Sequence, residues 1–290
     1  GHPQKAMYAT IATVVIKTIL DPVCIYGFGW GIRGAAVATI VAQVISLTWQ
    51  FKLFSNKDEL LHFHRGIFRL KRKIVFDSLA IGMSPFLMNV CACAIVIVIN
   101  NSLQEHGGDM AIGAYGIINR LLTLYVMIVL GLTMGMQPIV GYNFGAQKID
   151  RVKQTLKLGI VSGVVITSSG FFICELFPHA VSAIFTDSDH LIDLAVDGLR
   201  ITVIMFPFVG AQIVIGNFFQ SIGKAKISIF LSLTRQLLYL LPCLLLFPNW
   251  WGLKGIWISM PVSDALAFIT AVISLIIYIK KVSRQHPIAE

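Results

Sequence analysis

The sequence predicts an all-α integral membrane protein with about eight transmembrane helices. Three observations carry this prediction: 56% of the 290 residues are hydrophobic, only 13% are charged, and the mean hydropathy is +0.79. A soluble domain carries about 25% charged residues, so water cannot be the main solvent for this surface. In lipid the backbone must satisfy its own hydrogen bonds, which leaves helices or a closed barrel. The apolar runs are continuous and about 20 residues long, which is the length that crosses a bilayer as a helix.

Eight apolar runs of this kind follow one another along the chain. Short polar turns separate them, except for one longer and strongly basic stretch at residues 56–73. Loops this short leave no room for a soluble catalytic domain. We expect the membrane-spanning helices at residues 6–28, 34–54, 74–100, 110–136, 156–177, 191–215, 227–247 and 255–279.

Basic residues alternate between the two ends of these helices. One set of ends carries most of the lysines and arginines, whereas the opposite ends hold Arg33, Lys254 and several acidic residues. Because basic loops stay in the cytoplasm, both ends of the chain are expected to be cytoplasmic. The net charge of +9 is spread over separate loops, which argues against a nucleic-acid partner and in favour of the lipid bilayer. The basic flanks are residues 52–73, 148–157, 224–226 and 280–284.

A short motif occurs twice, 221 positions apart. Trp30-Gly-Ile-Arg-Gly34 opens the second expected helix, and Trp251-Gly-Leu-Lys-Gly255 opens the eighth. Each follows a helix with a proline near its outer end, Pro22 and Pro242. A repeat of six helices in one orientation fits two lobes related by an axis along the membrane normal. The alternative is two unrelated turns that both need a glycine and an interfacial tryptophan.

The repeat predicts how the chain divides. Residues 1–55 would be the last two helices of an N-terminal six-helix lobe, residues 56–73 a cytoplasmic linker between lobes, and residues 74–290 a complete C-terminal lobe. We therefore expect a complete protein of twelve helices, with four of them preceding Gly1.

Five segments of the chain resemble the multidrug and toxic compound extrusion (MATE) family, and in detail its bacterial MepA-like branch. They occur in the family's order and spacing along the whole chain. The segments are Gly135-Met-Gln-Pro-Ile-Val-Gly-Tyr-Asn-Phe-Gly-Ala146, Phe218-Phe-Gln-Ser-Ile-Gly-Lys224, Ile19-Leu-Asp-Pro22, Gly252-Leu-Lys-Gly-Ile-Trp257 and Leu233-Thr-Arg-Gln236. The positions taken as structural motif residues are Asp21, Pro22, Gln137, Pro138, Gly141, Asn143, Gly145, Gln220 and Gly223.

This resemblance implies a secondary-active exporter of the bacterial inner membrane. It implies two six-helix lobes and export of small organic cations in exchange for protons or sodium ions, with no other cofactor, no metal site and no required oligomer. An exporter or flippase of lipid-linked saccharides, built on a related two-lobed fold, is the alternative. An enzyme is not expected, because the chain has no catalytic motif such as HExxH, GxSxG or DxD at a membrane face.

Four of the charged side chains inside the expected helices are functional candidates, because charge is expensive there. At a rise of ~1.5 Å per residue, all four lie near the middle of a hydrocarbon core ~30 Å thick. Arg235 and Asp264 lie on consecutive helices and can form an ion pair. Asp264 would then either exchange a proton or cation during transport, or lock the two helices together. The other two candidates are Arg120 and Arg200.

Neutral polar residues inside the expected helices complete the set of translocation and coupling candidates. Gln43 is the counterpart of Asp264 in the repeat, which indicates a shared demand for hydrogen bonding. The others could line a cleft or bond helix to helix. They are Asn89, Asn119 and Gln212.

Two local arrangements are also expected. Lys17 and Asp21, four residues apart on the first helix, can pair along one face. Gln137 and Asn143 are expected to tie down a Gly- and Pro-containing turn, because buried backbone groups there need partners.

One family feature is absent. Sodium-coupled members carry acidic residues in their seventh and tenth helices, which correspond here to the third and sixth expected helices. Asp77, Asp193 and Asp197 lie only at the ends of those spans. The resemblance therefore does not extend to that cation site, and the aspartate important in proton-coupled members would precede Gly1.

Overall fold

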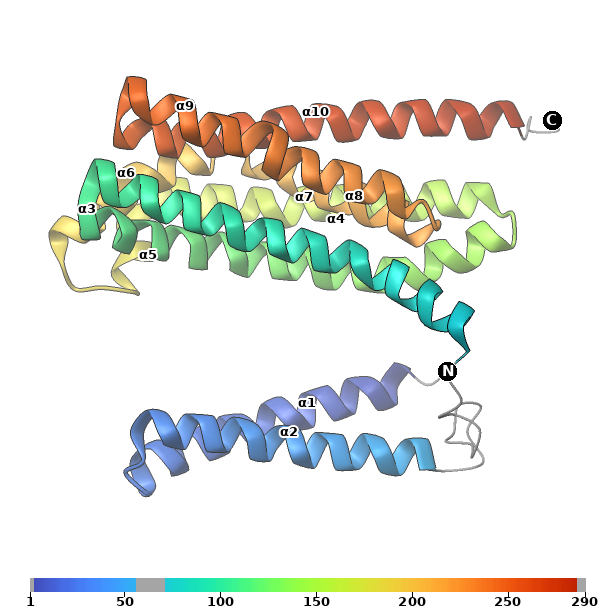
Figure 1. Ribbon diagram of the computed structural model, residues 1–290, viewed down its shortest axis with the longest axis horizontal. Coiled ribbons are helices and arrows are strands. Elements are labelled where there is room, and N and C mark those ends of the chain that lie inside the picture. Colours follow the sequence, from blue (N-terminus) through green and yellow to red (C-terminus); the bar gives the residue numbers. More distant parts are fainter. Residues whose placement is uncertain (1–2, 56–70, 286–290) are drawn as a thin grey trace. The chain divides into compact units, whose positions relative to one another are not determined.

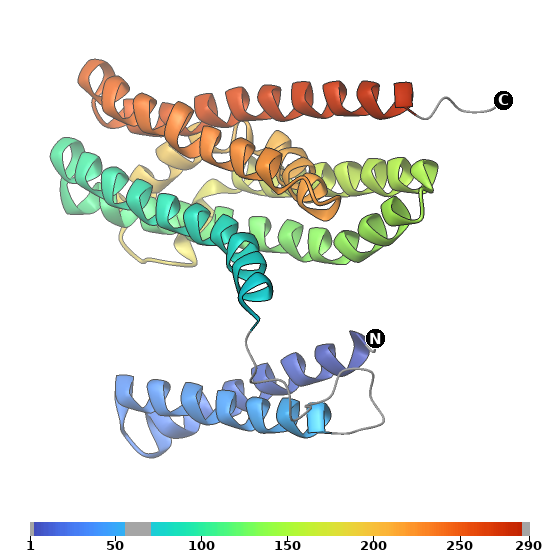
Figure 2. The same cartoon turned by 45° about the vertical axis from the view of Figure 1, so that its right-hand side comes forward.

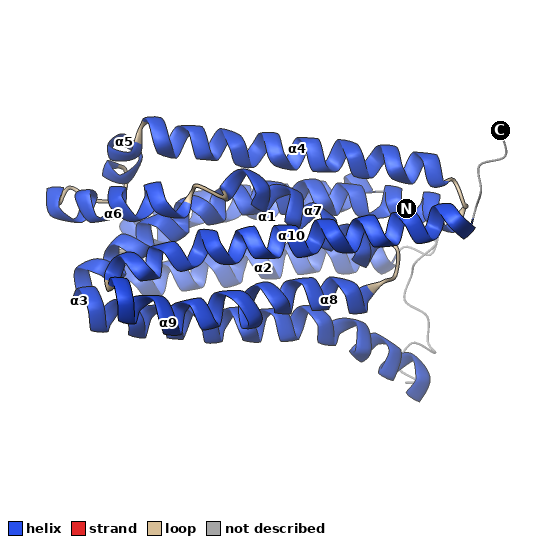
Figure 3. Ribbon diagram, turned by 90° about the horizontal axis from the view of Figure 1, so that it is seen from above, coloured by secondary structure: helices blue, strands red, loops and turns tan. Residues whose placement is uncertain are grey.

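The structure, a computed structural model, describes residues 3–55 and 71–285. All regular elements in this part of the chain are helices, and no strand occurs among the residues described (Figures 1 and 3). The chain forms two compact units, Gly1–Phe76 and Asp77–Glu290. The expected linker at residues 56–73 lies almost entirely outside the described residues, so the expected lobe boundaries stay a prediction.

The first unit is a hairpin of two helices. The first of them changes from an α-helix to the wider π-helix after a proline. Proline has no N–H for the helix ladder, and a π-helical turn begins directly after Pro22. There the amide of Phe28 donates to the carbonyl of Val23, five residues back, at 3.0 Å. These helices are the first two that the sequence predicts. The elements are α1 (Pro3–Pro22), η1 (Val23–Gly27) and α2 (Gly31–Ser55).

The second unit begins within the first turns of α3 (Arg72–Gly145), which consists of two helices that meet at a break. Gly108 has φ 65° and ψ −164°, a conformation that glycine adopts without steric cost. The chain turns back on itself there (Figures 1 and 2). The two arms are therefore the third and fourth expected helices.

The turn expected around Gln137 and Asn143 is in fact helical. Helix α3 continues to Gly145, and Asn143 donates its side-chain amide to the carbonyl of Ile139 within the same helix, at 2.8 Å. Gln137 is exposed. Pro138 removes one bond from the ladder, but the neighbouring apolar face is buried and its packing keeps the segment helical.

The sixth expected helix, residues 191–215, is not continuous. Helices α6 (Asp189–Thr202) and α7 (Phe206–Ser221) form a pair bent by 58°. Pro207 explains the break, because a missing N–H is tolerated in the first turn of a helix but not in its interior. The chain therefore starts a new helix at Phe206. The elements before the pair are α4 (Ile149–Leu176) and α5 (Pro178–Ala183).

The last two spans are a composite helix and a long one.

Six helices of the described chain are long and apolar enough to cross a membrane, and counting the bent pair as one span gives seven. Because α3 turns back at Gly108, its two arms bring the crossings to the eight that the sequence predicts. The final elements are α8 (Ala225–Leu233), the π-helix η2 (Thr234–Leu240), α9 (Leu241–Trp251) and α10 (Leu253–Gln285).

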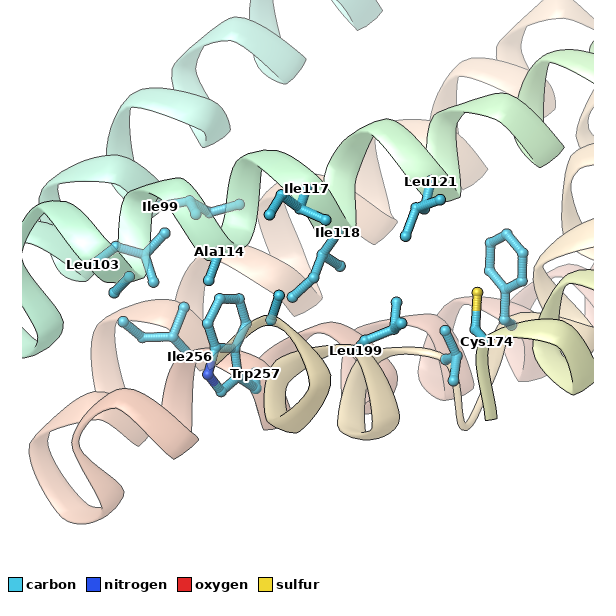
Figure 4. Packing of buried hydrophobic residues seen from close by; sticks show 14 of the residues in the cluster. Ile99, Leu103, Ala114, Ile117, Ile118, Leu121, Cys174, Leu199, Ile256 and Trp257 are labelled. Atoms are coloured by element: carbon cyan, nitrogen blue, oxygen red, sulfur yellow. The ribbon is translucent and has the colours of Figure 1, made fainter. Parts of the chain in front are cut away.

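One core of the second unit surrounds Trp257, which is 2% exposed. Trp257 belongs to α10, and its indole faces Ala114 and Ile118 of α3 (Figure 4). Gly198 makes room for it, since a Cβ there would lie 2.7 Å from Cδ1 of Ile118 and 3.0 Å from the indole. Lipid supplies no hydrophobic force between helices, so close packing of this kind holds them together.

Helices α4 and α7 touch backbone to backbone. A Cβ on Gly210 of α7 would overlap the carbonyl of Gly163 on α4. Thr167 donates its hydroxyl to the carbonyl of Pro207 at 3.0 Å, which joins the two helices. Small residues permit this approach. The buried face of α4 carries them three or four residues apart, at Gly159, Gly163, Thr167, Gly170 and Cys174.

The two Trp-Gly turns share one backbone feature, a glycine at positive φ directly after the tryptophan. Gly31 has φ 53° and Gly252 has φ 55°. A Cβ on Gly34 would lie 2.5 Å from the carbonyl oxygen of Cys24, and one on Gly255 would overlap the carbonyl of Phe247. Each motif therefore needs one glycine for its backbone angle and another for the close approach of the preceding helix.

Gly255→Ala is expected to destabilise the chain by about 1–3 kcal/mol, because the added methyl group meets backbone that cannot rotate away. Unfolding in mixed detergent micelles would measure this change. Gly135→Ala is the matched control, since nothing lies within 4 Å of a Cβ there. Equal stability of the two variants would contradict the close approach.

Candidate functional site

The candidate site lies where η2 packs against α10. Pro242, the second residue after η2, has no amide to donate to a carbonyl four residues back. The ladder shifts to a wider register, in which the amide of Leu241 donates to the carbonyl of Gln236. Such π-helical turns are frequent at functional sites. Arg235 is the second residue of this segment.

Arg235 and Asp264 form the ion pair that the sequence predicts. Nε and Nη2 of Arg235 both donate to Oδ1 of Asp264, each at 2.8 Å. The side chain of Asp264 is 11% exposed and that of Arg235 is 36% exposed. Both residues lie well inside helices that are long and apolar enough to cross a membrane. The pair thus joins two spans at a depth where isolated charges are costly.

A second polar contact lies beside this pair. The hydroxyls of Tyr239 on η2 and Thr270 on α10 are 2.8 Å apart, within hydrogen-bond distance. Two buried oxygens of the same π-helix, Oγ1 of Thr234 and Oε1 of Gln236, have no hydrogen-bond partner among the described residues. A buried polar atom without a partner carries a cost, so this segment holds polar groups that the packing around it does not satisfy.

The remaining candidates do not gather at this site. Arg120 and its neighbour Asn119 are exposed on α3, and Arg200 is exposed in the last turn of α6. Gln212 is buried on α7, and its Oε1 has no partner in the described part of the chain. Two further candidates are exposed on their helices, Gln43 on α2 and Asn89 on α3.

The expected pairing of Lys17 with Asp21 is wrong. Lys17 is exposed, whereas Oδ1 of Asp21 is buried and has no hydrogen-bond partner among the described residues. Spacing of four residues brings two side chains to one face, but here the carboxylate turns into the protein at the start of the wide turn.

One motif glycine has a clear structural role, and a second lies in ordinary van der Waals contact with a neighbouring carbonyl. Gly223 has φ 74° and ends α7, and the next amide, of Lys224, donates back to the carbonyl of Phe219 at 2.8 Å. This is the left-handed C-terminal cap for which glycine is preferred. Gly141 passes close to the carbonyl of Ser221, 3.4 Å from the position of a Cβ. The structure gives no such reason for Gly145 or Gln220, which are exposed.

Metal ligands do not cluster in the described chain. No group of three or more His, Cys, Asp or Glu side chains among residues 3–55 and 71–285 could hold a metal ion. The chemistry available at the site is that of one carboxylate, one guanidinium and several hydroxyl and amide groups.

Comparison with known families decides where the chain belongs. The MatE family profile matches residues 80–245, which is more than half of the chain. The chain belongs to the MatE family. It is therefore a multi-pass integral membrane protein, and the relatives that match it are transporters.

Two curated relatives match almost the whole chain. Multidrug export protein MepA of Staphylococcus saprophyticus is 26% identical over 279 residues, which cover 96% of this chain and 61% of MepA. Multidrug export protein MepA of Staphylococcus haemolyticus is 28% identical over 266 residues, covering 92% of this chain and 58% of that protein. The chain thus spans less than two thirds of the length of these relatives.

Solved structures share the fold. An outward-facing conformation of a multidrug resistance MATE family transporter of the MOP superfamily has a TM-score of 0.86 at 22% identity, over 96% of this chain and 63% of that one. An inward-facing conformation of such a transporter has a TM-score of 0.78 at 22% identity, over 98% and 66%. Both support an all-α integral membrane fold for this MatE chain.

Proposed function

We propose that this chain is the larger part of a secondary-active multidrug exporter. It would move cationic amphiphilic compounds out of a bacterial cell in exchange for protons or sodium ions. The observation that carries this proposal is the alignment of nearly the whole chain with the two MepA exporters. In this proposal the first unit supplies the last two helices of one lobe, the second unit is the other lobe, and both chain ends are cytoplasmic.

The ion pair supports a way to couple an ion to movement. Protonation of Asp264 would remove the charge that holds Arg235, leaving η2 attached to α10 through the weaker Tyr239–Thr270 contact. The π-helix before Pro242 has a widened ladder, and such turns are sites where helices bend. The competing role is a permanent lock between the two spans, which would need no titration during transport.

Transport can be tested in a bacterium that lacks its own multidrug exporters. Expression of the chain, as its gene encodes it, should lower the accumulation of a fluorescent lipophilic cation and leave a neutral analogue unaffected. A protonophore should abolish the effect if protons drive export, whereas replacing sodium by choline should abolish it if sodium does. Unchanged accumulation with correctly inserted protein would contradict the proposal.

A further inference from the structure

A basic cavity lies at one end of the second unit. Its volume is about 750 Å³. The turn from α3 to α4, the turn from α7 to α8 and the C-terminal part of α10 meet at this end, on the right in Figures 1 and 2. The opposite end of the same unit carries the turns at Gly108 and Gly252.

The charged groups that line this cavity are all positive among the residues described. Lys224, Lys226 and Lys281 contribute to its wall, and no acidic residue in the described part of the chain does. Asp150, in the first turn of α4, lies near in sequence but is not part of the lining. Three ammonium groups around one hollow repel each other, so an anion between them would relieve that repulsion.

Two of the lysines stand at the ends of membrane spans and have apolar neighbours one turn deeper. One apolar span begins at Lys226 and another ends at Lys281. Phe230 and Ile277, each four residues further toward the membrane interior, also line the cavity. Residues four apart share a helix face. The cavity is therefore cationic at the level of the lipid headgroups and apolar just below it.

Two helices start at the rim of the cavity. Helix α4 follows Lys148 and helix α8 follows Lys224, and neither N-terminus is capped by a side chain. The positive end of a helix favours an anion. Both starts follow a residue in left-handed conformation, Gln147 at φ 60° and Gly223 at φ 74°, and Gln147 itself lines the cavity.

We propose that this cavity binds an anionic phospholipid of the inner leaflet. The lipid phosphate would lie among the three lysines, and an acyl chain would run along Phe230 and Ile277. Basic pockets between transmembrane helices on the cytoplasmic side are suited to such headgroups. A soluble phosphate would satisfy the charges but not the apolar floor, and a cationic compound would be repelled. This site is separate from the Arg235–Asp264 pair and does not depend on transport.

The test uses the whole chain, delipidated in neutral detergent and titrated with phosphatidylglycerol or phosphatidylcholine. Bound lipid is counted by native mass spectrometry. We expect phosphatidylglycerol to be retained far better than phosphatidylcholine. Replacing Lys224, Lys226 and Lys281 by glutamine should weaken phosphatidylglycerol binding by roughly a hundredfold. This follows because each lysine contributes about 1 kcal/mol to the binding of an anionic lipid, and about 1.4 kcal/mol corresponds to a tenfold change in affinity.

A matched variant separates the cavity from general surface charge. Arg151, Lys157 and Lys280 are exposed near the same end of the unit but do not line the cavity. Their replacement by glutamine removes equal charge and should leave binding within about threefold of the parent. Circular dichroism and gel filtration confirm that both variants fold. Equal loss in the two triple variants, or displacement of the lipid by inorganic phosphate alone at millimolar concentration, would overturn the proposal.

Discussion

Asp264→Leu is expected to destabilise the chain by about 2.5–3.5 kcal/mol, the cost of an unpaired arginine near the middle of a membrane helix. The variant leaves Arg235 inside a membrane span with a charge it cannot lose, because guanidinium is not deprotonated in proteins. Arg235→Met should cost less, about 1–3 kcal/mol, since the remaining carboxyl can take up a proton and become neutral. Reversible unfolding in mixed detergent micelles measures both values.

The double variant, Arg235→Met with Asp264→Leu, decides between the two roles of the pair. Replacing both partners by apolar residues of similar size is often neutral or stabilising, so the double variant should recover most of the lost stability. If the pair is only a lock, transport recovers as well. If Asp264 carries the coupling ion, the double variant folds but does not transport. Failure of the double variant to recover stability would show that the 2.8 Å contacts are not a coupled pair.

Features that rest on local pattern could be predicted from the sequence. Long apolar runs place the helices, the Trp-Gly motif places two turns with a glycine at positive φ, and charges within consecutive spans identify Arg235 and Asp264. Each of these depends on residues close in sequence or on one strong energetic rule, the cost of charge in lipid.

Features that rest on tertiary packing could not be predicted from the sequence. Pro138 and Pro207 have the same missing N–H, yet one lies inside α3 and the other starts α7. The difference comes from the surroundings: Met136 and Val140 are buried beside the first proline and keep that segment helical. The π-helix before Pro242 could not be predicted for the same reason. A proline predicts that the hydrogen-bond ladder is disturbed, but not whether the helix kinks, tightens or widens.

The stripe of small residues on α4 is a feature that the sequence does contain. Gly159 and Gly163 form a Gly-x-x-x-Gly motif, which is typical of close transmembrane helix pairs. The sequence cannot identify its partner, since many helices carry small residues. The structure does so by placing Gly210 against Gly163.

Gly210→Val is expected to lower the stability of the chain by at least about 3 kcal/mol, the upper part of the range for overpacking. The new side chain would overlap the carbonyl of Gly163 and lie 2.6 Å from Oγ1 of Thr167. Backbone cannot rotate away as a side chain can, so α4 and α7 must separate. The bond from Thr167 to the carbonyl of Pro207 would then break, which removes the hydrogen bond that joins the two helices.

Gly216→Val on the same helix is the matched control. Nothing lies within 4 Å of a Cβ at Gly216, so this variant adds an equal volume and an equal change of helix propensity without a clash. We expect it to change stability by less than about 1 kcal/mol. Unfolding in micelles compares the two variants directly. A crosslink between cysteines placed on the facing sides of α4 and α7 should form in the control and be lost in Gly210→Val. Equal stability of the two variants would mean that α4 and α7 do not meet through Gly163 and Gly210.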